Sequence, residues 1–215
     1  MKKLSMILAL SVAFFMGTKT YAQEGLSFGV KVGGNFSNFS GSDFSDELDS
    51  KLGFQLGLTA EYGLSDNLFI GSGLEFTTKG ARAKEELGPV TMKTSINPMY
   101  LQLPVHIGFK FEVANGVNLL AEVGPYAAFG IGGKSKVTIK IGDEKETEKN
   151  NFFGSEDEGG AKRFDFGVGG AIGAEFGKVV VKAGYDLGLA DISRFDDGDN
   201  KVKNGNLFLT LGFKF

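Results

Sequence analysis

The chain has 215 residues, of which 33 are glycine and none is cysteine, and its formal net charge is −3 at pH 7. This composition excludes a disulfide framework, a thiolate metal site and a lipid anchor on cysteine. The mild negative charge gives no basis for a nucleic-acid partner.

The first 22 residues predict a secretory signal peptide. Lys2 and Lys3 precede an apolar run from Leu4 to Met16, and the small residue Ala22 offers a cleavage site. The run is short for a membrane-spanning helix, so a transmembrane anchor is the weaker alternative. Cleavage would leave residues 23–215 as one domain outside the cytoplasm. It would change the formal charge from −3 to −6, because it removes three lysines and no acid.

Eight stretches after this segment alternate large apolar residues with polar or small ones, as strands with one apolar face do. In the last stretch, for example, Leu207, Leu209 and Leu211 share one face, while Thr210 and Lys214 lie on the other. Helical periodicity is absent from all eight. The predicted strands are residues 26–37, 52–62, 68–79, 99–113, 118–132, 164–176, 179–189 and 206–215.

The connections between these strands alternate between short and long, which is typical of an up-and-down barrel. The short ones are rich in turn residues, and the long ones are polar and charged like the outer loops of membrane barrels. The short connections are 63–67, 114–117 and 177–178, and the long ones are 39–51, 80–97, 133–163 and 190–205. We therefore predict an all-β fold, an eight-stranded antiparallel up-and-down transmembrane β-barrel. Both termini and the tight turns would lie in the periplasm, and four mobile loops would lie outside.

Two kinds of barrel fit this alternation, because a soluble lipocalin-like barrel also alternates but keeps its apolar residues inside. Here the other face combines glycines such as Gly71, Gly108 and Gly167 with scattered charges. The interior of an eight-stranded barrel is only wide enough for side chains, so small residues must make room for long ones. We therefore expect lipid outside and a side-chain-filled interior.

Aromatic residues gather where the predicted strands end, as they do in the interfacial girdles of membrane barrels. The girdle beside the short turns comprises Tyr62, Phe111, Phe176, Phe213 and Phe215, and the one near the long loops comprises Phe36, Phe54, Phe76, Phe129 and Phe164.

Several short motifs lie on the predicted strands. They are Tyr-Leu-Gln-Leu-Pro-Val at 100–105, Glu-Val-Gly-Pro-Tyr at 122–126, Gly-Ile-Gly-Gly-Lys at 130–134, Arg-Phe-Asp-Phe-Gly at 163–167, Gly-Tyr-Asp-Leu-Gly-Leu at 184–189 and Leu-Thr-Leu-Gly-Phe-Lys-Phe at 209–215. In them the chain resembles the small outer-membrane β-barrel family that is widespread in Bacteroidetes and often labelled porin family or PorT-like. The resemblance spans essentially residues 23–215 and implies an integral protein of the cell outer membrane. Some relatives take part in type IX secretion and gliding, a role that these motifs do not assign to this chain.

The last strand is also similar to the signal that outer-membrane barrel-assembly machinery reads in such proteins. Phe215 stands at the chain terminus with Phe213 two positions before it. We expect both residues to serve as this assembly signal. The alternative is an ordinary last strand whose edge pairs with the first.

Charged residues on the glycine-rich face are nearly balanced, with seven acids and five bases. Buried ions are tolerated only when they are paired, so we predict a lumen charge network, with a narrow path for ions or protons as the alternative. The predicted network is Lys31, Glu61, Glu75, His106, Lys110, Glu112, Glu122, Asp165, Glu175, Lys182 and Asp186, and Lys79 and Lys214 lie on the same face.

No group of residues predicts catalysis. His106 is the only histidine, and a single imidazole in a lumen is more often a hydrogen-bonding filler than a catalyst. We therefore expect no enzyme activity, no cofactor and no metal site.

The expected partners are outer-membrane lipid, lipopolysaccharide and the barrel-assembly machinery, and the expected state is a monomer. Arg82, Lys84 and Lys93 are loop bases that could contact lipopolysaccharide phosphates. The leading hypothesis for function is a surface protein whose loops support membrane integrity or bind something outside. The alternatives are a narrow porin-like channel for small solutes and an accessory role in a secretion system.

Overall fold

The computed structural model describes residues 25–41, 48–154, 160–193 and 201–215. The predicted signal peptide, residues 1–22, lies outside this part of the chain, as do portions of three of the four predicted loops. No helix among the described residues is long and apolar enough to cross a membrane.

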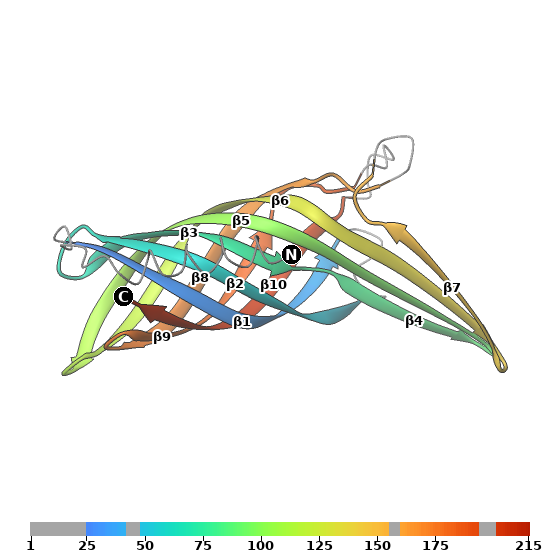
Figure 1. Cartoon of the computed structure of the whole chain (residues 1–215), viewed down its shortest axis with the longest axis horizontal. Coiled ribbons are helices and arrows are strands. Elements are labelled where there is room, and N and C mark those ends of the chain that lie inside the picture. Colours follow the sequence, from blue (N-terminus) through green and yellow to red (C-terminus); the bar gives the residue numbers. More distant parts are fainter. Residues whose placement is uncertain (1–24, 42–47, 155–159, 194–200) are drawn as a thin grey trace, which may run out of the picture.

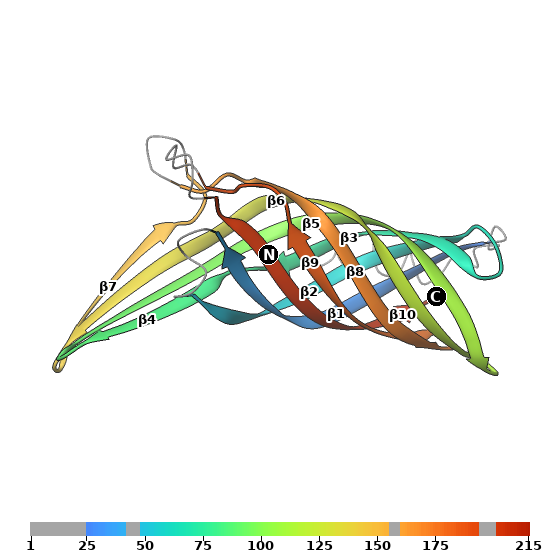
Figure 2. The same cartoon turned by 180° about the vertical axis from the view of Figure 1, so that it is seen from behind.

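Eight antiparallel strands form a closed ring (Figures 1 and 2). The ring closes because β1 pairs with β2 on one side and with β10 on the other. Its strands are β1 (Leu26–Ser40), β2 (Asp49–Gly63), β3 (Leu68–Thr78), β5 (Val90–Ala114), β6 (Val117–Ile141), β8 (Phe164–Phe176), β9 (Val179–Gly188) and β10 (Lys203–Lys214). The predicted fold class is confirmed.

The large apolar side chains of these strands point away from the barrel. Leu52, Leu58 and Leu209 are 66%, 59% and 59% exposed, whereas Asn35 and Asn206 on the opposite face are fully buried. An apolar outer wall around a polar interior is the arrangement of a membrane barrel. It excludes the alternative of a soluble barrel with an apolar interior.

Glycines on the inner wall make room for aromatic rings that point inward. A Cβ atom on Gly108 would lie 2.1 Å from the ring of Phe69, and one on Gly130 would lie 2.2 Å from the ring of Phe153. Each ring therefore packs directly against backbone, as the narrow bore of an eight-stranded barrel requires.

Regular sheet also occupies two of the stretches that the sequence predicted to be mobile loops. Residues 80–97 and 133–163 contain β4 (Ala81–Leu87), β7 (Glu144–Asn151) and long extensions of β5 and β6, which remain paired as far as Val90 and Ile141. The prediction failed because the high charge of these stretches resembles a solvated loop, although their apolar residues keep the period of two. Gly88 and Gly142 make the tight tips, with φ values of +60° and +59° that favour glycine.

We call this four-stranded extension the blade, and it comprises β4, residues 90–97 of β5, residues 133–141 of β6, and β7. It continues well past the ends of the other strands (Figures 1 and 2). The barrel end from which it projects is called the mouth. The opposite end, which carries the tight turns, the start of β1 and the end of β10, is called the turn end.

Candidate functional site in the barrel interior

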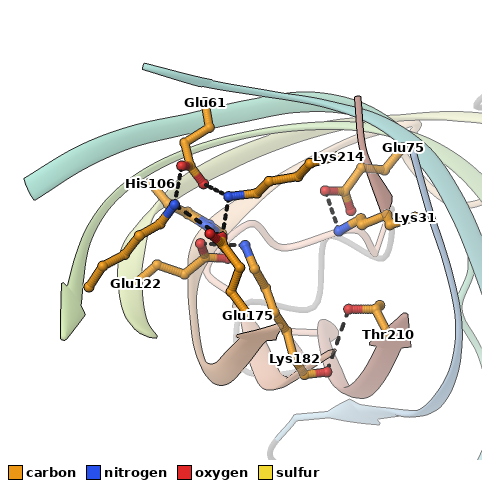
Figure 3. A network of polar contacts seen from close by, with 10 residues as sticks. Lys31, Glu61, Glu75, His106, Glu122, Glu175, Lys182, Thr210 and Lys214 are labelled. Atoms are coloured by element: carbon orange, nitrogen blue, oxygen red, sulfur yellow. Dashed lines mark hydrogen bonds and ion pairs between the residues drawn. The ribbon is translucent and has the colours of Figure 1, made fainter. Parts of the chain in front are cut away.

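Four charged side chains form a closed ring of ion pairs near the turn end (Figure 3). Lys110 Nζ lies 3.1 Å from Glu175, and Lys214 Nζ lies 2.9 Å from Glu61. Contacts from Lys110 to Glu61 and from Lys214 to Glu175 complete the ring. The four residues come from β5, β8, β10 and β2, so this ion ring links four strands and has no net charge.

Two further ion pairs cross the middle of the barrel. Lys31 Nζ lies 2.6 Å from Glu75, and Lys182 Nζ lies 2.7 Å from Glu122. The Nδ1 atom of His106 lies 3.5 Å from the other oxygen of Glu122. Figure 3 shows the Lys31 and Glu75 pair on one side of the lumen, and His106, Glu122 and Lys182 together on the other.

A cavity of about 70 Å³ lies between these pairs, and His106, Asp186 and Lys31 are among the residues that line it. This is room for more than one water molecule. His106 Nε2 is buried and has no hydrogen-bond partner among the described residues. The imidazole therefore contributes one contact to Glu122 and directs its second nitrogen into the interior.

The layer nearer the mouth is built around a fully buried ion pair. Lys79 Nζ lies 3.1 Å from Asp165, and neither side chain is exposed. The same carboxylate accepts hydrogen bonds from Asn204 at 2.9 Å and Tyr126 at 3.4 Å. Lys79 Nζ also lies 4.6 Å from the ring centroid of Tyr126 and 5.2 Å from that of Tyr100. These contacts surround the ion pair with protein groups on the Oδ2 side of the carboxylate, whereas Asp165 Oδ1 has no hydrogen-bond partner among the described residues.

Apolar side chains cover this layer at the mouth. Phe153, which follows β7, packs edge-on against Tyr100 with ring centroids 5.5 Å apart. Its neighbour Phe152 stacks on Phe39 at 6.0 Å, and Ile192 is only 1% exposed beside Phe39. Segments that follow β7 and β9 thus join strand residues in two adjoining clusters that close this end of the barrel.

The segment that carries Ile192 is fixed by its neighbour Asp191, at the surface of the mouth. Its Oδ1 atom accepts hydrogen bonds from Ser193 Oγ at 2.8 Å, Ser193 N at 3.0 Å and Val202 N at 3.0 Å. Burial alone would raise the pKa of Asp191, but these hydrogen bonds hold it below its ordinary value. The carboxylate is therefore charged near neutral pH and clamps two parts of the chain together.

The structure brings together ten of the eleven residues of the predicted charge network, and Glu112 stays apart. Glu112 is exposed near the turn end and belongs to none of the ion pairs recorded among the described residues. Asp186 lies inside but is held by amides, since it accepts hydrogen bonds from Gln102 and Asn206, both at 3.2 Å. Lys79 and Lys214 belong to the pairs nearest the two ends.

Sequence reasoning missed the neutral members of this network. Asn35, for example, donates hydrogen bonds to Asn206 at 2.7 Å and to the backbone oxygen of Thr78 at 2.8 Å, deep inside the barrel. Their positions in the strands could have identified them, because these amides alternate onto the same inward face as the charged residues.

The two residues of the predicted assembly signal lie on the outer wall at the turn end. Phe213 and Phe215 are 45% and 65% exposed, and their ring centroids are 6.1 Å apart. Strand β10, which contains Phe213 and ends one residue before Phe215, completes the ring by pairing with β1. Their role in assembly remains a prediction.

A model of the family described as outer membrane protein beta-barrel domain matches residues 21–194. No relative is found among curated protein sequences. Among solved structures, Neisserial surface protein A is 17% identical, with 89% of this chain and 100% of that chain covered and a TM-score of 0.44. OprG from Pseudomonas aeruginosa is 16% identical, with 89% and 96% covered and a TM-score of 0.45. The outer membrane enzyme PagL is 11% identical, with 85% and 98% covered and a TM-score of 0.41.

The last of these comparisons corrects one prediction from the sequence, namely that the chain is not an enzyme. PagL is an outer membrane enzyme, so an enzyme is among the solved barrels to which this chain is similar. The expectation of no enzyme activity is therefore withdrawn, because a fold does not fix function, and catalytic groups can be placed on a barrel without altering its strands.

Proposed function

The chain belongs to the outer membrane protein beta-barrel domain family, and from this premise we propose that it is an integral outer-membrane protein whose closed barrel anchors the blade at the cell surface. Through the blade it supports membrane integrity or binds a partner outside the cell. The observation that carries this proposal is the combination of a filled, capped barrel with a sheet that projects beyond the apolar wall.

The proposed orientation has the mouth and blade outside and the turn end in the periplasm. Short turns at one end and long extensions at the other support it, because membrane barrels of this class have short periplasmic turns and longer extracellular segments. The described part of the blade is also rich in exposed charged side chains, which suit an aqueous environment.

A narrow channel is the second candidate, and the cavity of about 70 Å³ in mid-barrel favours it. The contacts on either side of this cavity weigh against it. The ion ring stands toward the turn end, and the buried pair of Lys79 and Asp165 stands toward the mouth beneath the apolar clusters. A role beside a secretion system has only the motif resemblance in its favour.

The orientation can be tested by cysteine labelling, because the native chain has no cysteine. We expect Thr147→Cys, on β7 of the blade, to react with a membrane-impermeant maleimide on intact cells. Asn115→Cys, in the turn between β5 and β6, should react only after the outer membrane is permeabilised. Labelling of the turn variant on intact cells, with protection of the blade variant, would overturn the proposal.

The role of the blade can be tested by shortening it. In the variant, a short turn joins β3 to the barrel part of β5, and another joins the barrel part of β6 to Phe152, so that Phe152 and Phe153 still close the mouth. We expect this barrel to insert normally but to fail to restore resistance to a large antibiotic, or attachment to a surface, in cells that lack the native protein. Full restoration of both properties by the shortened barrel would contradict a role for the blade.

A further inference from the structure

The two faces of the blade differ sharply in charge. Residues paired across antiparallel strands share a face, and neighbours along a strand alternate between faces. Lys84 pairs with Lys93, which pairs with Thr138, which pairs with Thr147, so these four define one face. The remaining residues follow from them by alternation.

This face, which we call the basic face, carries eight bases and one acid, Glu86. The bases are Arg82, Lys84, Lys93, Lys134, Lys136, Lys140, Lys145 and Lys149. The opposite face carries four acids and no base, and its centre is apolar. The acids are Glu85, Glu144, Glu146 and Glu148, and the central apolar residues include Met92, Val137 and Ile139. Contact with solvent alone does not require bases and acids to be separated onto opposite faces of a sheet.

Bases on the basic face are also placed directly opposite one another. Lys84 faces Lys93, Lys136 faces Lys149, and Lys140 faces Lys145. Like charges at directly opposed positions destabilise a sheet. The acids of the other face avoid this arrangement, since Glu146 faces Ile139 and Glu148 faces Val137. The repulsion between lysines would be relieved by an anion bound over each pair.

Few of these bases have an acid partner in the protein. Arg82 lies 3.9 Å from Asp49, and Lys84 contacts Glu86. No ion pair to an acid is recorded within the described ranges for the other six, all of which are exposed. Their charge is therefore directed to solvent or to a ligand.

The basic face is a direct continuation of the lipid-facing wall of the barrel. On β5, Lys93 lies on the same outward side of the strand as Leu101 and Leu103. On β6, Lys134 lies on the same outward side as Phe129 and Ile131. A register shift beside Met99 realigns β6 with β5 at this point. The outer wall thus changes from apolar to strongly basic where the strands leave the ring.

We propose that the basic face binds the phosphate groups of lipopolysaccharide in the outer leaflet around the barrel. This inference rests on the proposed function, because it requires the blade to project on the outer side. Glycolipid phosphates would lie just above the hydrocarbon layer, next to the point where the apolar wall ends. They would carry charges opposite to the paired lysines, and several could be contacted at once along the sheet.

The first test measures binding of the full-length protein in phospholipid nanodiscs to fluorescent lipopolysaccharide, by anisotropy at fixed salt. The variant is the triple substitution Lys136→Gln, Lys140→Gln and Lys145→Gln. Each base near an anionic surface is worth about a fivefold change in affinity, so we expect this variant to bind about a hundredfold more weakly. A charge-matched control, Lys162→Gln, Lys178→Gln and Lys201→Gln, removes three bases away from the blade and should bind like the native protein.

The second test compares three anions as competitors, namely intact lipopolysaccharide, the same material after enzymatic removal of its phosphates, and a soluble sulfated polysaccharide. We expect only the intact glycolipid to compete strongly. Equal competition by the dephosphorylated glycolipid would overturn the proposal. Equal competition by the soluble polysaccharide would also overturn it, because the occupant would then be a free polyanion rather than the membrane.

These measurements do not depend on orientation in the cell, so they separate this inference from the proposed function. Normal labelling of Thr147→Cys on intact cells with no effect of the triple substitution would refute the glycolipid site and leave the surface role standing. Native affinity in nanodiscs with a blade labelled from the periplasmic side would refute the proposed orientation and, with it, the site in the outer leaflet.

Discussion

Lys79 and Asp165 are 86 positions apart in the chain, yet their charged groups meet inside the barrel and neither side chain contacts solvent. Alternation along each strand was enough to predict that both point inward. Sequence could not predict that they meet, because the pairing of residues far apart depends on the stagger of all eight strands. Nor could it predict that Asn204 and Tyr126 donate hydrogen bonds to the same carboxylate oxygen.

Removing one member of this pair should be more harmful than removing both. Lys79→Met leaves a buried carboxylate without its counter-ion, and such a loss typically costs about 3–5 kcal/mol. The double variant Lys79→Met with Asp165→Leu has no uncompensated charge and should lose less stability than either single variant. Urea unfolding in lipid vesicles measures all four proteins of the cycle, and strict additivity would contradict a direct pair.

At the level of strands, the sequence predicted the parts of the chain that lie in the apolar layer and misjudged those beyond it. The period of two in β8 gave its bounds correctly, since residues 164–176 were predicted and Phe164–Phe176 is observed. In β6 a period of two runs from Val137 through Ile139 to Ile141, beyond the register shift beside Met99, but dense charge on the other face obscured it. Charge is a poor sign of a loop where strands extend beyond the membrane and both faces meet water.

Packing between β3 and β5 offers a test of the narrow bore. A Cβ atom at Gly108 would lie 2.1 Å from the Phe69 ring, so Gly108→Ala should destabilise the barrel by about 1–3 kcal/mol through overpacking. Combining it with Phe69→Leu should recover part of the loss. Gly34→Ala is the control, because a Cβ there meets only one backbone oxygen at 3.9 Å. Equal effects of the two alanine substitutions on urea unfolding would count against this account.

Across the whole molecule, layers of different chemistry fill the barrel from one end to the other. The ion ring, the central pairs, the buried pair and the apolar clusters succeed one another from turn end to mouth. The sequence correctly gave the closed barrel and the polar character of its interior. It could not give the closure at the mouth, because Phe152, Phe153 and Ile192 lie outside the periodic strands and are recruited only in three dimensions.

Such a filled barrel should not let sugars through. In liposome-swelling experiments we expect vesicles that contain the protein to swell in an isosmotic sugar solution no faster than protein-free vesicles. Vesicles with an open porin serve as the positive control. Swelling clearly above the protein-free rate would show that the side-chain layers in the barrel separate to open a path, and would favour the channel.

The seam between the first and last strands has a consequence for biogenesis. β1 and β10 pair from Gly29 with Lys214 to Ser40 with Lys203. The backbone hydrogen-bonding groups along this edge of β1 therefore have no partner until β10 is in place. Hydrocarbon tolerates no open sheet edge. A nascent chain that still lacks β10 therefore has no stable place in the bilayer, and insertion has to follow the synthesis of β10.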